Sequence, residues 1–171
     1  LVTNGFLYTR VPYDVLNDFA PVSLLSTSAS VLTVHPSVPA HSVRDLLQLA
    51  KARPGTLNYG SAGIGTNPHI AGELFNLLGK VNIVAVQFKG GGPALVAAVS
   101  GEIGVTVTGI SESAPFVEAK RLRALGVTSL KRSPVMPDLP SIAETLPGYE
   151  FSTWQGIVAP KGTPRAIVAF L

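Results

Sequence analysis

Cysteine is absent from this 171-residue chain, so it can form no disulfide, perform no thiol chemistry and hold no cysteine-based zinc site. Charged residues are also scarce, at 13% of the sequence, and no run of five basic residues occurs. The net charge of +3 is too dilute for a nucleic-acid surface, although a mild excess of this kind suits small anionic ligands. Long apolar runs are missing as well, and none reaches the length of a membrane span.

Apolar residues, by contrast, make up 46% of the chain, which is enough for an ample core in one domain or in one domain with pieces of another. This composition also excludes a disordered chain. Leu1 opens the sequence without a methionine, and Leu171 ends it inside an expected helix. We therefore expect a fragment of a longer protein, and the lack of a signal peptide in this stretch says little about that parent.

Short apolar strands alternate with helices through the middle of the chain. Such alternation predicts an α/β fold in which a largely parallel sheet carries helices on both faces. In sheets of this kind the ligand crevice lies beyond the carboxyl ends of the strands. The expected strands are 56–59, 82–87, 103–108 and 124–128, and the expected helices are 68–78, 93–100 and 113–120.

The flanking segments are less regular. Residues 1–20 are expected to be irregular, and 19–35 to hold two strands with a kink at 26–30. Ser42 opens a helix that ends at Arg53, and Ser141 begins a capping box for one short helix. Pro147-Gly148 marks a boundary, beyond which we expect a strand at 151–159 and a helix after Pro164.

The stretch from Leu57 to Gly72 reads as a strand, a loop of very small residues and the start of a helix. Asn67 can cap that helix, with Pro68 at its first position. The glycines let another molecule approach the backbone, where N–H groups meet the positive end of the helix dipole. Ser61 and Thr66 add hydroxyl donors, so the expected guest is a carboxylate or phosphate. The spacing fits neither a dinucleotide fingerprint nor a P-loop.

Two further loops of small polar residues follow the next two strands, at Lys89–Gly92 and Thr108–Ser111. Lys89 could neutralise an anionic ligand or be a solvated loop lysine. His69 is more consistent with a structural or orienting role than with catalysis. Trp154 could belong to a core or line a cleft.

Catalytic signals are weak. Gly109 to Ser113 nearly forms a nucleophile elbow, but Ser113 stands where glycine is required, and no His or Asp is clearly placed to serve Ser111. The three histidines have no metal-ligand spacing. We expect no catalytic residue, no metal and no cofactor.

Several motifs resemble the Bug/TctC family of extracytoplasmic solute receptors. Tyr59–Phe75 (YGSAGIGTNPHIAGELF) is similar to the glycine-rich stretch of that family, and Phe88–Leu95 (FKGGGPAL) to its second loop. Leu122–Pro134 (LRALGVTSLKRSP) and Pro137–Glu144 (PDLPSIAE) match in the same order, as do the shorter PGYE and DFAPV segments. The resemblance covers most of the chain.

The resemblance implies a periplasmic two-lobed binding protein of the type II fold. It would capture small organic carboxylates, or amino acids, for the membrane subunits of a tripartite tricarboxylate-type transporter. Residues 23–145 would form the second lobe, with 1–22 and 146–171 as remnants of the first. Segments 19–35 and 145–160 would then run close together as the crossovers between lobes.

Taken together, motifs and resemblance assign the ligand site to ten residues. Thr108 departs from the family pattern, because many members carry an acidic residue there, and this puts the usual recognition of a ligand amine or hydroxyl in doubt. The residues are Ser61, Gly63, Gly65, Thr66, His69, Lys89, Gly90, Gly91, Thr108 and Trp154.

Two other classes remain open. An enzyme on a doubly wound fold that acts on an anionic substrate would need a carboxylate or histidine aimed into the glycine loops. An interaction module without a ligand would have a dry, closed loop edge. We also expect that the chain binds ligand weakly or not at all without the rest of the first lobe, and that it could associate with another copy of itself.

Overall fold

The computed structural model describes residues 2–171 and divides the chain into two compact units. Unit 2 is the continuous stretch Ala29–Ser152. Unit 1 combines the residues up to Ser28 with Thr153–Leu171. The chain passes from unit 1 to unit 2 within one long strand, β1 (Phe19–Val34), and returns at the beginning of β6 (Ser152–Pro160).

Unit 2 is built on a mixed sheet in the strand order β3-β2-β4-β1-β5. Strand β2 (Asn58–Ser61) pairs in parallel with β3 (Val84–Gln87) on one side and with β4 (Val105–Gly109) on the other. The end of β1 lies antiparallel between β4 and β5 (Arg123–Val127). The four short strands therefore share one direction, which confirms the largely parallel sheet, and β1 is the exception.

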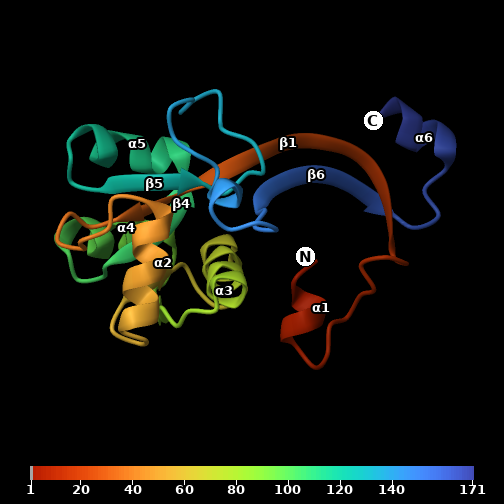
Figure 1. Ribbon diagram of the computed structural model, residues 1–171. Helices are drawn as coiled ribbons and strands as arrows, with labels where there is room; N and C mark the ends of the chain where they lie inside the picture. Colours follow the sequence, from red (N-terminus) through yellow and green to blue (C-terminus); the bar gives the residue numbers. More distant parts are fainter. Residues whose placement is uncertain (1) are drawn as a thin grey trace. The chain divides into compact units, whose positions relative to one another are not determined.

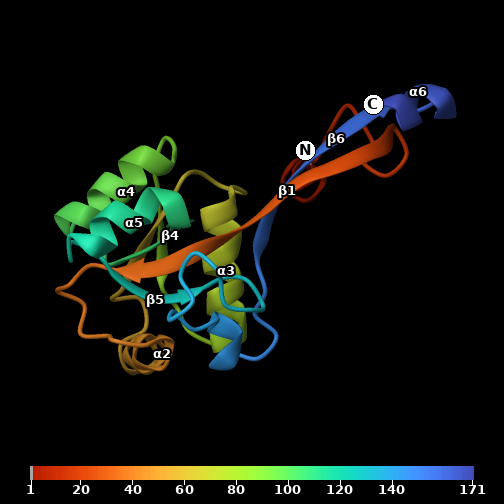
Figure 2. The same cartoon turned by 90° about the horizontal axis from the view of Figure 1, so that it is seen from above.

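Helices cover both faces of this sheet (Figures 1 and 2). Side chains alternate between the faces along each strand, so Leu32 and Val34 of β1 point to the opposite side from Val31 and Thr33. One side packs on α2 (Val43–Ala52) and α3 (Asn67–Gly79), and the other on α4 (Gly91–Ser100) and α5 (Ile110–Glu118).

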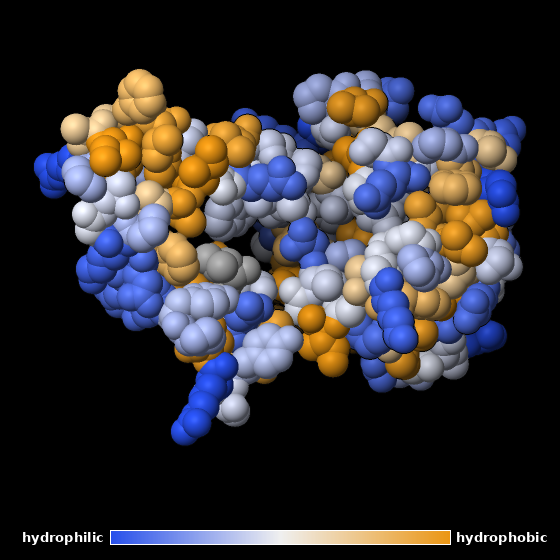
Figure 3. Space-filling view, turned by 180° about the vertical axis from the view of Figure 1, so that it is seen from behind, coloured by the Kyte–Doolittle hydropathy of each residue, from blue (hydrophilic) through white to orange (hydrophobic). Residues whose placement is uncertain are grey.

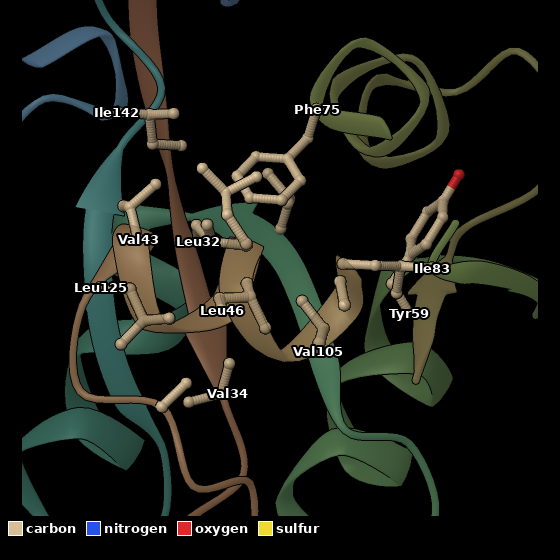
Figure 4. Packing of buried hydrophobic residues seen from close by; sticks show 14 of the residues in the cluster. Leu32, Val34, Val43, Leu46, Tyr59, Phe75, Ile83, Val105, Leu125 and Ile142 are labelled. Carbon is tan, nitrogen blue, oxygen red and sulfur yellow. The ribbon is translucent and has the colours of Figure 1, made fainter. Parts of the chain in front are cut away.

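The larger core lies between the sheet and helices α2 and α3. In Figure 4, Leu46 of α2 and Phe75 of α3 meet Leu32 and Val105 of the sheet. Tyr149 closes this core: its ring packs edge-on against Phe75 at 6.2 Å between centroids, and its hydroxyl donates to the Ala71 carbonyl at 3.1 Å. Such a core can stabilise unit 2 through burial of its own side chains.

The opposite face of the sheet is more polar. Helix α4 packs there through small side chains, including those of Ala94, Ala97 and Ala98. Thr33 and Thr106 lie directly opposite each other on β1 and β4 and are fully buried. Neither hydroxyl has a hydrogen-bond partner within the described residues, which is a costly arrangement.

Unit 1 contains the first part of β1, most of β6, α1 (Asn4–Leu7) and α6 (Arg165–Phe170). β1 and β6 pair with each other, so the segments expected to run close together do so. Among the described residues of unit 1, only Ala159 is buried, and apolar side chains gather on its surface (Figure 3).

Several expected boundaries were wrong. Residues 19–34 form one continuous strand rather than two kinked ones, because β1 finds ladder partners along its length in β6, β4 and β5. Residues 4–7 are helical rather than irregular. Helix α4 begins at Gly91, before the expected start at Pro93, and α5 begins at Ile110 rather than Ser113.

Asn67 is not the cap of α3. Thr66 is the N-cap residue, with extended backbone angles, and Asn67 is already helical. The capping box at Ser141 is confirmed, although the helix it opens, η1 (Ile142–Glu144), is a single 3₁₀ turn. Within residues 2–171, none of the helices has both the length and the apolar character needed to cross a membrane.

Candidate functional site

The carboxyl ends of β2, β3 and β4 bring two glycine loops and the start of α5 to one edge of the sheet in unit 2. The loop expected at Thr108–Ser111 is absent, because β4 ends at Gly109 and α5 begins at Ile110. Ser61, the last residue of β2, lies opposite Gln87, the last residue of β3, and the Phe88 N–H donates to the Ser61 carbonyl at 2.8 Å. Because β2 also pairs in parallel with β4, the loop after Ser61 lies between the loop after β3 and the start of α5. The structure thus joins two of the three loops that the sequence predicted to converge.

The Ser61–Thr66 loop is folded around one carbonyl group. The Gly63 carbonyl accepts from the Ser61 hydroxyl at 3.0 Å, from the Thr66 hydroxyl at 2.6 Å and from the Thr66 N–H at 3.2 Å. Gly63 and Gly65 adopt φ angles of +129° and +75°, which side-chain-bearing residues rarely adopt. The two hydroxyls expected to meet a ligand are therefore engaged inside the loop.

Ser61 is a strand residue, not a loop residue, and its side chain is fully buried. Its hydroxyl also accepts from the Gly63 N–H at 3.3 Å. Thr66 is half-buried at the start of α3. Of the two hydroxyls, only that of Thr66 lies near solvent, and it would have to release the Gly63 carbonyl in order to donate to a guest.

The second loop, Lys89–Gly92, exposes backbone that glycine side chains do not cover. Gly90 precedes α4 with a φ of +113°, and a Cβ atom added at Gly90, Gly91 or Gly92 would meet nothing within 4 Å. Gly90 offers no side chain to cap the helix. The N–H groups in the first turn of a helix have no partner inside the helix, so this open end suits an anion. Lys89 is exposed beside it.

Thr108 lies beneath the edge rather than on it. Its side chain is buried, and its hydroxyl forms a hydrogen bond with the hydroxyl of Ser113, which is buried in α5. The two hydroxyls satisfy each other between β4 and α5. The half-buried residues at this position of the edge are instead Gly109 and Ile110.

His69 belongs to the first turn of α3 and is half-buried. Its Nδ1 atom accepts a hydrogen bond from the Gly65 N–H at 3.4 Å, so the ring contacts the glycine loop directly. Trp154 belongs to unit 1, where it is 56% exposed and lies against Gly156. It is not among the residues that the structure joins in unit 2.

Sequence reasoning missed a hydrogen-bonded pair behind the loop. The Tyr59 hydroxyl donates to Glu73 Oε1 at 2.7 Å and lies 3.3 Å from the His69 carbonyl oxygen. Burial, with Glu73 as the second cause, raises the pKa of Tyr59 well above its usual value. The helical spacing of His69 and Glu73 was visible in the sequence, but nothing there linked them to a strand residue.

It also missed Thr128, which follows β5 at the same edge. The Thr128 hydroxyl accepts from the Ser30 N–H at 2.8 Å, its N–H donates to the Ser30 carbonyl at 2.9 Å, and its carbonyl accepts from the Phe151 N–H at 2.9 Å. This one residue holds both ends of unit 2, close to where the chain enters and leaves it. No local sequence signal marks a contact across such separations.

No group of three His, Cys, Asp or Glu residues in the described part of the chain could hold a metal ion. The edge is a set of hydroxyl and backbone N–H groups with the exposed side chains of Lys89 and Glu112 beside it. The fold around it is an α/β unit of the periplasmic binding-protein type.

Comparison with known proteins shows which family within this class the chain belongs to. A family model described as the tripartite tricarboxylate transporter family receptor, TctC, matches residues 1–171, and the chain belongs to that family. The UPF0065 protein encoded in the tcbD-tcbE intergenic region of Pseudomonas sp. is 42% identical over 170 residues, which are 98% of this chain and 51% of that protein. The chain spans about half the length of the curated relatives it matches.

Solved structures of similar proteins have the same fold. Rpa4515 of R. palustris, determined with adipate, superimposes with a TM-score of 0.83 at 39% identity, over 95% of this chain and 55% of that one. MatC of Rhodopseudomonas palustris, determined with bound malate, gives 0.83 at 32% identity, over 98% of this chain and 57% of that one. The expected family and fold class are confirmed.

Proposed function

We propose that this chain supplies one wall of the carboxylate-binding cleft of an extracytoplasmic solute receptor. The observation that carries the proposal is the meeting of two glycine loops, two helix N-termini and Lys89 at one edge of the unit 2 sheet. Each helix end adds about half a positive charge, and nearby N–H groups can donate to an anion.

A dicarboxylate is the ligand class we propose. Adipate and malate, the ligands of two structural neighbours, are both dicarboxylates. The edge of unit 2 would bind one carboxylate group of such a ligand. The Gly90 to Gly92 amides would be the principal hydrogen-bond donors, and Lys89 would neutralise the negative charge. The loop that contains Gly63, Gly65 and Thr66 would lie on the other side of the same group, and its donors would reach the ligand only after leaving their present partners.

We further propose that unit 2 is the second lobe of a two-lobed receptor and that unit 1 is part of the first. Family membership supports this assignment, as does the crossing of both unit boundaries by paired strands. The partners would be the membrane subunits of a tripartite tricarboxylate-type transporter, which places the receptor outside the cytoplasm. A cleft normally encloses its ligand from both lobes, so unit 2 alone should bind weakly.

The enzyme alternative gains no support from the site. A general base needs a free imidazole or carboxylate within reach of the substrate. The Nδ1 atom of His69 is already bonded to Gly65, and Glu73 is bonded to Tyr59. A receptor needs only the donors that the edge provides.

Calorimetric titration tests the proposal. The full-length receptor, which includes the rest of the first lobe, would be titrated with adipate, with malate, and with adipamide, which has the length of adipate but no charge. We expect heat of binding for a dicarboxylate and none for adipamide. Absence of binding for both acids and for other small anions at millimolar concentration would contradict the proposal.

A matched pair of variants locates the site. Gly90→Asp places a carboxylate beside the helix start, and should weaken adipate binding at least about tenfold, because like charges a few ångströms apart repel by a few kcal/mol. Gly148→Asp is the control, because Gly148 also has a positive φ, +87°, and open space around its Cα. Equal effects of the two substitutions would place the site elsewhere.

A further inference from the structure

The contact between His69 and Gly65 indicates which nitrogen of the neutral ring carries the proton. A backbone N–H group can only donate, so Nδ1 must accept and carries no proton. The neutral ring therefore carries its proton on Nε2. His35 differs, because its Nδ1 faces the Ser37 hydroxyl at 2.7 Å, and a hydroxyl can donate or accept.

Other groups around His69 hold its backbone, not its ring. The Tyr59 hydroxyl, from β2, lies near the His69 carbonyl, and Glu73, one turn further along α3, accepts from Tyr59. Tyr149 approaches α3 at Ala71, and β4, which also packs on α3, carries no charged residue. Two other charged residues lie near this edge: Lys89, exposed after β3, and Glu112, exposed in the first turn of α5 beside Gly109. Among the described residues, the ring's one hydrogen-bond partner is Gly65.

We infer that His69 is a proton-linked positioning residue: its neutral ring holds the Gly65 amide, and its protonation releases that amide toward an anion. Histidine is the side chain that changes charge between about pH 5 and pH 8. Once Nδ1 carries a proton, it and the Gly65 N–H are two donors facing each other, and the hydrogen bond is lost. The loop gains a free N–H donor and a positive charge together.

This coupling has a definite sign. An imidazolium at His69 and a bound carboxylate attract each other, because they carry opposite charges. Binding of a proton and binding of the anion therefore favour each other, and the coupling is reciprocal.

The first test needs no ligand. In nuclear magnetic resonance spectra recorded across a pH titration, we expect the Gly65 amide and the His69 ring to change with one common midpoint, and the neutral ring to carry its proton on Nε2. His35 and His41 serve as internal references that leave the Gly65 amide unmoved. A Gly65 amide that does not follow His69, or a neutral ring protonated on Nδ1, would overturn the inference.

Two substitutions separate the hydrogen bond from the charge. His69→Asn places an amide oxygen close to the position of Nδ1, so it keeps an acceptor for Gly65 but cannot titrate. His69→Gln places its oxygen farther out and loses the acceptor. We expect the Gly65 amide to exchange slowly with solvent in His69→Asn and rapidly in His69→Gln. Equal exchange in both variants would contradict the positioning role.

The second test rests on the proposed function and uses adipate as the probe. Between about pH 7.5 and pH 5.5, the affinity of the native protein should rise by about two- to tenfold relative to that of His69→Asn, the range expected for one hydrogen bond. The variant corrects for titration of adipate itself. Equal pH dependence in both proteins would refute the coupling. Failure of both to bind adipate at any pH would refute the proposed function, while the ligand-free titration still decides the role of His69.

Discussion

Unit 2 and unit 1 differ in how far their apolar side chains are buried. In unit 2, leucine, valine and aromatic side chains from both sides of the sheet are buried, among them Leu46 and Tyr149 with no exposed surface. In unit 1, Phe6 and Leu16 are each 89% exposed. The burial of apolar side chains is thus distributed very unevenly between the two units.

The comparison separates folding from binding. Unit 2 is one continuous segment with its own core, so it can fold through its own contacts, and it also holds the candidate site. The large exposed apolar surface of unit 1 is of the kind that marks an interaction surface. Association with a second copy through that surface stays a prediction.

The largest effect should come from the unit 2 core. Leu46→Ala removes a fully buried side chain and should lower the free energy of unfolding by about 2–5 kcal/mol. Leu25→Ala is the matched change in unit 1, where the side chain is 62% exposed, and should cost less than about 0.5 kcal/mol. Urea unfolding followed by circular dichroism measures both. Similar losses would remove the contrast between the units.

A second contrast lies inside unit 2, among three fully buried threonines. Thr128→Val leaves the Ser30 N–H without an acceptor and should destabilise by about 1–3 kcal/mol. Thr33→Val and Thr106→Val remove hydroxyls that have no partner among the described residues, and each should stabilise by about 1 kcal/mol. Melting temperatures of the three variants would order them. Destabilisation by all three would mean that the two hydroxyls are satisfied.

The smallest effect concerns the exposed surface of unit 2. Arg132 donates two hydrogen bonds to Glu144, at 2.8 and 2.9 Å, and lowers the pKa of that carboxyl from 4.5 to about 2. A carboxyl whose pKa is lowered by folding stabilises the folded state when the pH is above the pKa that the group has in the unfolded chain. This contribution is therefore present above about pH 4.5 and is lost as the pH falls toward 2. Glu144→Gln should flatten the fall in stability over that interval. An unchanged pH profile would show that the pair contributes nothing measurable.

Much of the fold was visible in the sequence, because it depends on local patterns. Alternating apolar strands and helices, with glycine and proline between them, predicted the sheet and its covering helices to within a few residues at most ends. The prediction for segment 19–35 was wrong because its serine-rich middle has a low strand propensity. Only pairing with distant partners makes β1 continuous.

The site was predictable in position but not in detail. Glycine spacing indicated the loops and their shared edge. It could not show that Ser61 and Thr66 both donate to Gly63, that Thr108 pairs with Ser113, or that Thr128 holds Ser30, because these bonds depend on how the folded chain orients each side chain. Which of the ten residues contact a ligand stays a prediction.

The central claim is that an anion binds at the glycine loops of unit 2. Amide chemical-shift mapping during a titration with adipate tests it most directly, since the method also detects weak binding. We predict that the largest shifts fall on Gly63, Gly65 and the amides of residues 90–92, and that adipamide produces none of them. Shifts confined to other segments, or equal shifts with adipate and adipamide, would contradict the account.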